Sequence, residues 1–351
     1  MAPARDVIGE ALAAAPADYL ASRWEASARR LEAAAREARS KEDPRLPRVA
    51  LEWGRVLVEL GRRNRAVGDQ ALVVLTALEE SPAAQQDPVL RAAAMVQRGR
   101  VYYWRKLIQN EGEWERCHTL FREALALSEE HRGAKGQAEA LFHVGLVYQL
   151  QMGLKRARPF FERSLAAARE AGDPLQQASA HRHLGFADEE AGQWDEALAH
   201  HQQALSLREQ MKFSRGVMFQ LSSVGHVLCV GKQDCAAAEP YFLRAAVLAL
   251  ELDEPLGEVE ARMGLGRVAQ ARNEGLMARK QFDAALLAAR RAGDLVSEAQ
   301  VGLALSEVLA EAGQRAESLR ALETAWELLV RSGQSHKSRE VVNALIRLRG
   351  S

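Results

Sequence analysis

The chain has 351 residues, of which 48% are hydrophobic and only 6% aromatic, so its core must consist mainly of small and aliphatic side chains. Lys plus Arg and Asp plus Glu number 47 each, and this balance gives no general attraction to nucleic acid or to an anionic membrane. The three cysteines include no CxxC pair and form no even set, which argues against a disulfide framework or a zinc motif.

The first residues are not expected to be a signal peptide, because Met1–Leu20 contains acidic residues and no continuous apolar segment. No stretch approaches the ~18 apolar residues of a membrane span. We therefore expect a soluble, cytoplasmic protein. The bias toward Ala, Arg, Leu and Gly suggests a bacterial source with GC-rich DNA.

Residues 1–45 predict two helices separated near Pro16, which form a degenerate repeat or an N-terminal cap. Trp24, Ser27 and Leu31 lie at helical spacing, where the second helix would need packing residues. Terminal units of helical arrays are commonly atypical, which favours the capping interpretation.

The first clear helix pair spans Leu46–Asp87, with a glycine inside its first helix. In the next pair the turn is stretched: Gly99 to Cys117 is 18 residues, whereas the corresponding distance in later pairs is 12. The six extra residues fall around Lys106–Glu111. We expect the first helix to continue past the usual turn, although an insertion in a regular array can also form a binding loop.

A 40-residue pattern occurs twice in residues 137–215, and Gly185 in the second copy is equivalent to Gly145 in the first. Apolar residues at helical spacing on both sides of a short break at Ala191–Trp194 predict a helix, a tight turn and a second helix. A glycine inside the first helix costs roughly 1 kcal/mol against alanine. Its expected role is to let the two helices approach closely. A period in this range indicates stacked helix pairs, because one pair cannot bury its own apolar face.

The array continues with further copies, one of which is a residue longer near Gly231–Cys235. These copies are Gly216–Leu256, Gly257–Val296 and Ser297–His336. A last helix with one apolar side follows and would cap the array. The predicted organisation is an N-terminal cap (1–45), a solenoid of about seven repeats (46–336) and a C-terminal capping helix (337–351).

These residues resemble the tetratricopeptide repeat, in which a glycine and an aromatic residue in helix A precede an alanine, an aromatic residue and a second alanine in helix B. The first copy matches this pattern with Gly145, Tyr148, Ala157, Phe161 and, for the second alanine, Ser164. The second copy matches with Gly185, Ala197, Ala204 and, in place of the aromatic residue, His201. The 40-residue period is similar to the long repeats of kinesin light chain and of sensor regions in bacterial regulators. The resemblance implies an all-α, right-handed superhelical solenoid.

No catalytic set, metal site or cofactor site is predicted. Gly264–Gly266 lies inside a helix with no preceding strand, so it is not a dinucleotide-binding loop. His143 and His183 share one repeat position, and either a metal or pH-switch role or an ordinary polar role fits them. Cys229 and Cys235 flank a turn, where we expect simple packing. We therefore expect a protein that is not an enzyme.

The resemblance places binding residues on the A helices, which line the concave face of such solenoids. Positions three before, one after and four after the marker glycine would point into this groove, together with immediate neighbours. The predicted partner-binding residues are Arg100, Tyr103, Trp104, Phe142, Gln149, Arg182, His183, Phe186, Glu189, His226 and Arg267. Aromatic side chains mixed with arginine are typical of interaction hot spots. Alternatively, apolar members of the set, Phe142 first, pack between neighbouring A helices.

The sequence therefore favours a non-catalytic scaffold or adaptor that binds a peptide or a partner's helix in the groove. One alternative is a ligand- or peptide-responsive regulatory sensor, whose effector would be a separate protein because no effector domain fits in the first 43 residues. Another is a structural protein that self-assembles into homo-oligomers through its exposed ends.

Overall fold

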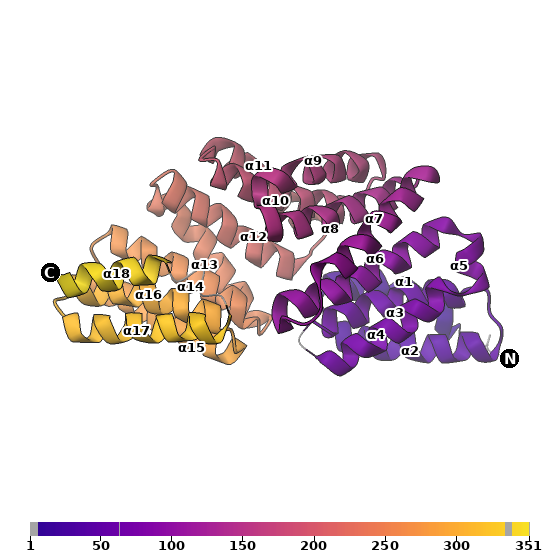
Figure 1. Ribbon diagram of the computed structural model, residues 1–351, viewed down its shortest axis with the longest axis horizontal. Coiled ribbons are helices and arrows are strands. Elements are labelled where there is room, and N and C mark those ends of the chain that lie inside the picture. The colour runs from indigo at the N-terminus through magenta and orange to yellow at the C-terminus, as the bar shows by residue number, and fades with distance from the viewer. Residues whose placement is uncertain (1–5, 63, 334–338, 351) are drawn as a thin grey trace. The chain divides into compact units, whose positions relative to one another are not determined.

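The computed structural model describes residues 6–62, 64–333 and 339–350, and every regular element within these ranges is a helix (Figure 1). The all-α prediction is confirmed. No helix in the described ranges is both long and apolar enough to cross a membrane. The first ten α-helices are α1 (Val7–Leu20), α2 (Trp24–Ser40), α3 (Leu46–Leu60), α4 (Arg65–Glu79), α5 (Pro82–Gln86), α6 (Pro88–Trp104), α7 (Trp114–Glu130), α8 (Ala134–Met152), α9 (Leu154–Glu170) and α10 (Pro174–Glu190). The remaining α-helices are α11 (Trp194–Gln210), α12 (Ser214–His226), α13 (Cys235–Glu251), α14 (Pro255–Ala271), α15 (Gly275–Ala292), α16 (Leu295–Glu311), α17 (Arg315–Arg331) and α18 (Arg339–Gly350).

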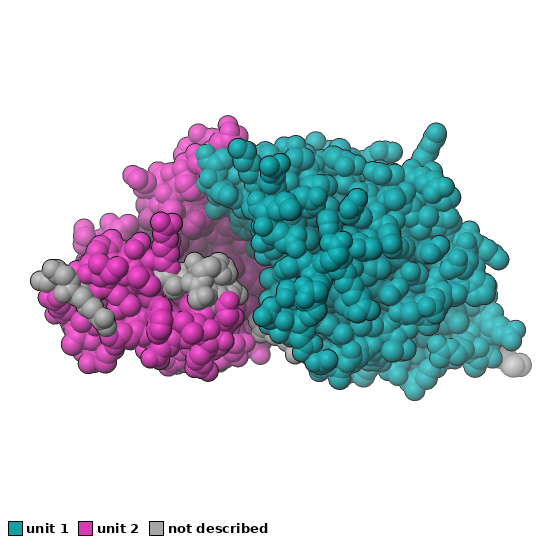
Figure 2. All heavy atoms as spheres, viewed as in Figure 1, with its two compact units in different colours: residues 1–191, 206–213 teal, residues 192–205, 214–351 magenta. Residues whose placement is uncertain are grey.

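The chain divides into two compact units, which are described separately below and coloured differently in Figure 2. Unit 1 comprises residues 1–191 and 206–213, and unit 2 comprises residues 192–205 and 214–351. Within each unit, successive helices pack against each other in pairs, such as α8 with α9 in unit 1 and α14 with α15 in unit 2.

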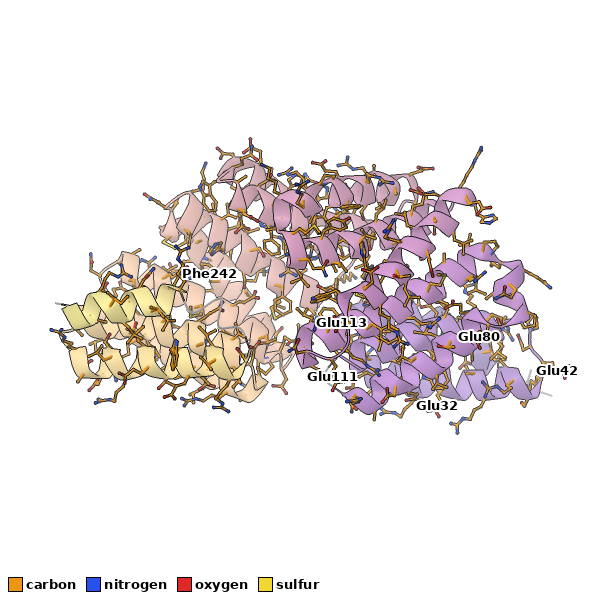
Figure 3. All side chains as sticks on the ribbon, viewed as in Figure 1. Glu32, Glu42, Glu80, Glu111, Glu113 and Phe242 are labelled. Carbon is orange, nitrogen blue, oxygen red and sulfur yellow. A yellow bond between two sulfur atoms is a disulfide. The ribbon has the colours of Figure 1, made fainter. Side chains whose placement is uncertain are left out.

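A glycine of helix A and an aromatic ring of helix B form the recurring contact inside a pair. In unit 1, a Cβ atom placed on Gly145 of α8 would lie 2.6 Å from Cε1 of Phe161, a fully buried residue of α9. In unit 2, the ring of Phe242 (labelled in Figure 3) likewise lies against Gly225 of α12. The marker glycines thus allow close approach by leaving room for a ring on the helix backbone, and this explains why they persist despite their helix propensity.

Helix starts and turns follow local chemistry. Asp173 precedes Pro174, and its side chain accepts a hydrogen bond from the backbone N–H of Gln176 at 3.0 Å, which satisfies one free donor at the start of α10. The turn between α10 and α11 contains Gly192 at φ 72°, a left-handed conformation that glycine adopts without steric cost. An aspartate cap and a left-handed glycine therefore fix where α10 begins and where the chain turns toward α11.

Both departures from the regular repeat length become π-helical turns at the end of an A helix. The α6 helix continues as a π-helix, η1 (Arg105–Gln109), which ends at Asn110 with φ 53°. The α12 helix continues as a second π-helix, η2 (Val227–Gly231). A π-turn absorbs extra residues while keeping the chain helical. The structure thus shows the helix continuing past the turn, as the sequence favoured, and not a separate binding loop.

The expectation that Cys229 and Cys235 are simple packing residues is wrong, because the two form a disulfide. The bond joins the π-helical end of α12 to the first residue of α13. Counting cysteines could not reveal this pair, because the π-turn and the following bend bring the two residues together.

Terminal elements bury apolar faces on their neighbours. The α1 and α2 helices share a core with α3 that includes Ile8 and Leu31. At the other end, Val341 and Ala344 of α18 are buried against α16 and α17. The boundaries at residues 45 and 336 stay predictions, and residues 334–338 lie outside the described part of the chain.

Candidate partner-binding face

Nine of the predicted binding residues lie in unit 1, on α6, α8 and α10. Those on α8 and α10 are neither fully buried nor fully exposed. Tyr103 differs, since only 5% of its surface is exposed and it packs in the core with Cys117. Burial raises the pKa of Tyr103 well above its usual value. The extended α6 helix thus uses Tyr103 for packing, and we leave this residue out of the face proposed below.

Phe142, His183 and Phe186 form an aromatic patch on α8 and α10 of unit 1. The imidazole of His183 lies edge-on to both rings, with centroid distances of 5.2 Å to Phe142 and 5.6 Å to Phe186. Edge-to-face pairs of this kind contribute about 0.5–1.5 kcal/mol beyond the area they bury. The patch is therefore held in place by its own contacts.

Polar groups border the aromatic patch on two sides. The guanidinium of Arg182 lies 5.0 Å from the centroid of the Phe186 ring, within cation–π range. Nδ1 of His183 is 2.8 Å from Oε1 of Gln149, so an N–H at Nδ1 donates to this amide oxygen. Glu189 lies one turn farther along α10 and is partly exposed. The patch thus combines apolar rings with a cation, which suits an apolar group beside a negative charge.

The predicted residue Arg100 belongs to a charge network on α3, α6 and α8. The members of the network are Arg55, Glu59, Gln97, Arg100 and Glu139. Arg100 donates to Glu59 and, at 2.6 Å, to Oε1 of Gln97. Gln97 donates to Oε1 of Glu139 at 2.7 Å, and Nη2 of Arg55 is 3.7 Å from Oε2 of the same carboxylate. Because the members pair with each other, the network positions its charges and balances them.

Burial and neighbouring charges shift the pKa values of Glu139 in the network and of His143 beside it. Burial alone would raise the pKa of Glu139, but the charges of Arg55 and Arg100 and the hydrogen bond from Gln97 outweigh it and hold the pKa below its usual value. Burial and the charge of Arg100 lower the pKa of His143 to about 4. Nδ1 of His143 is 2.7 Å from the backbone oxygen of Glu139 and donates to it. His143 is thus a neutral core residue at pH 7.

The other predicted residues have different surroundings. Trp104 is partly buried and is covered by the guanidinium of Arg62, 4.0 Å from its ring centroid. In unit 2, Nη1 of Arg267 lies 3.3 Å from Nδ1 of His226, so the guanidinium donates to the imidazole. His226 and Arg267 therefore form their own polar pair within unit 2.

Sequence reasoning missed Arg55, Glu59, Gln97 and Glu139. A signal for Arg55 was present, because it directly follows Gly54 just as Arg100 directly follows Gly99. The carboxylates and the glutamine occupy other positions on their helices, and only the packing of α3, α6 and α8 brings them together. Their role could not be predicted from repeat position alone.

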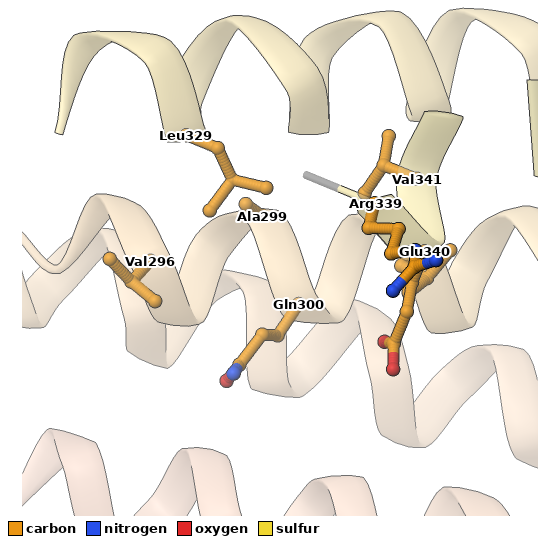
Figure 4. Close-up of a pocket in the computed structure, with 8 residues that line it drawn as sticks. Val296, Ala299, Gln300, Leu329, Arg339, Glu340 and Val341 are labelled. Carbon is orange, nitrogen blue, oxygen red and sulfur yellow. The ribbon is translucent and has the colours of Figure 1, made fainter. Parts of the chain in front are cut away.

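Metal-binding groups and cavities are two further places where a ligand could bind. No group of three or more His, Cys, Asp or Glu side chains within the described ranges could hold a metal ion. A cavity of about 350 Å³ lies among α16, α17 and α18 (Figure 4). Its lining residues are Val296, Ala299, Gln300, Leu303, Leu329, Arg339, Glu340 and Val341. We assign no ligand to it.

Comparison with known protein families identifies the type of repeat in part of the chain. Residues 136–210 match the family described as tetratricopeptide repeat. These residues are tetratricopeptide repeats. The matched segment covers α8, α9, α10 and α11, which include the whole aromatic patch and its polar neighbours. No curated protein matches the chain.

Solved structures with the same fold cover nearly the whole chain. A Rap protein complexed with competence and sporulation factor has a TM-score of 0.61 at 16% identity, over 99% of this chain and 98% of that one. The apo form of the quorum sensor NprR from B. thuringiensis has a TM-score of 0.58 at 16% identity, over 98% and 97%. Aspartyl phosphate phosphatase F from Bacillus subtilis has a TM-score of 0.53 at 14% identity, over 99% and 95%. Identities this low show a common fold and no more.

Proposed function

We propose that this chain is a non-catalytic interaction protein that binds a peptide or a partner's helix on the A-helix face of unit 1. The observation that carries the proposal is the aromatic patch with Arg182. Four large side chains from two successive A helices hold each other in place, yet none is fully buried. A rigid group of aromatic residues and arginine that stays accessible is the composition and geometry of a binding hot spot.

The neighbouring groups indicate which partner chemistry fits. An apolar side chain would pack on Phe142 and Phe186, and a carboxylate beside it would pair with Arg182. Arg100 is held by Glu59 in the charge network and is only 12% exposed, so it is less suited to pairing with a ligand. We therefore expect peptides with an acidic residue next to a large apolar one.

A peptide-library selection tests this function. Peptides enriched on the wild-type protein would be synthesised, and their affinity measured by fluorescence polarisation for wild type, for an Arg182→Ala, Phe186→Ala double variant and for a matched control. We expect the double variant to bind roughly 30-fold or more weakly, which corresponds to the ~2 kcal/mol of a hot spot. The control is Arg163→Ala on α9, whose side chain is 55% exposed; it should bind as the wild type does. The proposal fails if no peptide is enriched, or if the enriched peptides bind the double variant equally well.

A second candidate is a regulatory sensor that acts on a separate effector protein. It is favoured by full-length similarity to the structures of a Rap protein complexed with competence and sporulation factor and of the quorum sensor NprR. Hydrogen exchange with a selected peptide separates the two functions. A scaffold would gain protection only on α8 and α10, whereas a sensor would also change exchange in helices away from the patch, such as α2 and α4.

Self-assembly remains a distinct alternative for the same chain. It predicts that the mass measured by light scattering rises with protein concentration, whereas the scaffold and sensor proposals are compatible with a constant mass. A constant mass up to high concentration would remove this alternative.

A further inference from the structure

The disulfide between Cys229 and Cys235 occurs at the place where unit 2 departs from the repeat. In a regular repeat the corresponding positions differ by five in residue number, as Glu189 and Trp194 do. Cys229 and Cys235 differ by six. The extra residue is taken up by the π-helix η2, and Gln233 follows it at φ 55°. The bond therefore closes a turn of unit 2 that is both longer than usual and π-helical.

The surroundings of this turn are set by neighbouring side chains of unit 2. The indole of Trp194 packs directly on Gly231, and Lys232 forms an ion pair with Asp195. Cys229 is buried in the same apolar core as Phe242. Cys229 is thus buried in a packed core against which Cys235 also lies, and the turn between the two cysteines lies against α11.

The two cysteines differ in burial. Cys229 is 7% exposed, whereas Cys235 is less buried and is the first residue of α13. Backbone N–H groups at a helix N-terminus stabilise a thiolate, which is the form that attacks disulfides. Cys235 is therefore the residue that a dissolved thiol or disulfide would meet first.

We propose that Cys229 and Cys235 form a reversible thiol–disulfide site that responds to small-molecule disulfides of the glutathione type. In oxidation, the Cys235 thiolate attacks one sulfur of glutathione disulfide, and the first glutathione leaves as a thiolate. The Cys229 thiol, after losing its proton, attacks the Cys235 sulfur of the mixed disulfide and releases the second glutathione. Two protein thiols become one disulfide, while one glutathione disulfide becomes two glutathione thiols.

The expected consequence is local. With the bond closed, the end of α12 and the start of α13 are tied across the π-turn. With the bond open, the backbone of η2 loses this tie, and its amide hydrogens exchange faster. The other π-helix, η1, has no cysteine within it and provides a matched internal control in the same protein.

The test uses the full-length protein in buffers of stepped glutathione to glutathione disulfide ratio. Thiols are alkylated with iodoacetamide, and the peptide containing both cysteines is read by mass spectrometry. We expect Cys229 and Cys235 to lose alkylation together along one two-electron curve. Cys117 should be alkylated only after denaturation, because it is fully buried and burial raises its pKa to about 12. The Cys117→Ser variant should follow the wild-type curve.

Either of two alkylation results would overturn the proposal. One is that both cysteines stay alkylatable in excess glutathione disulfide. The other is that neither becomes alkylatable in the folded protein at any glutathione ratio, which would make the bond permanent. Hydrogen exchange supplies a second readout: η2 amides should exchange at least tenfold faster in the reduced protein and in Cys235→Ser, whereas η1 amides should be unchanged. Equal η2 rates in both states would also contradict it.

Discussion

At the residue scale, a glycine without a side chain makes room for an aromatic ring in several helix pairs. The ring of Phe161 occupies the space that a side chain at position 145 would need, and the same relation recurs between Gly99 and Phe121. The cost of glycine in a helix is thus offset by the burial of a whole aromatic ring. This explains why the repeat is readable in the sequence even though few residues are identical between copies.

Gly145→Ala should destabilise unit 1 by roughly 1–3 kcal/mol, because the new Cβ atom would lie 2.6 Å from the Phe161 ring and force overpacking. The matched control is Gly68→Ala in α4, where a Cβ atom would meet its nearest neighbour at an ordinary 3.5 Å. That variant should gain up to ~1 kcal/mol from helix propensity. Urea unfolding followed by circular dichroism measures both, and changes of the same sign would contradict this account.

His143 should make unit 1 less stable in mild acid. Its pKa is about 4 in the folded protein and 6.5 when unfolded, so between these values the unfolded chain binds a proton that the folded chain does not. The free energy of unfolding should therefore fall by about 2 kcal/mol from pH 7 to pH 5 on account of this residue. His143→Leu should remove that share of the pH dependence, and identical slopes for the variant and the wild type would show that the imidazole is not buried neutral.

At the element scale, local signals predicted the helices, the turns and the places of the two irregular turns, but not that the extra residues form π-helices. Periodicity predicted α10 correctly, because helix geometry depends on nearby residues. The burial of Tyr103 and the disulfide at Cys229 both depend on how π-turns redirect a helix end. The charge network depends on contacts between helices far apart in sequence. These features arise from packing, which no single repeat encodes.

The last helix provides a test of capping. Val341 and Ala344 of α18 cover apolar residues of α17 such as Leu329. A chain ending after Gly333 should expose that face, unfold at a temperature several degrees lower and associate as its concentration rises. Thermal melting and light scattering measure these effects. A shortened chain that stays monomeric with an unchanged melting temperature would show that α18 is not a cap.

At the scale of the whole molecule, full-length similarity to solved structures shows a shared fold, while the function depends on particular side chains. Repeat position predicted Phe142, Arg182 and Phe186 as a group, and in the structure His183 contacts both phenylalanine rings while Arg182 lies over Phe186. The sequence could not show that Arg100 is largely occupied within the charge network. The aromatic patch is therefore the part of the predicted groove on which the proposed function depends most.

The central claim is that a partner lies on the aromatic patch, and site-specific photocrosslinking tests it most directly. Benzoylphenylalanine would replace Phe186 on α10 in one protein and Arg163 on α9 in another, and each would be irradiated with a library-selected peptide. We predict that the peptide crosslinks to position 186 and does not crosslink to position 163. Crosslinking from position 163 alone would place the partner on the B helices and contradict the account.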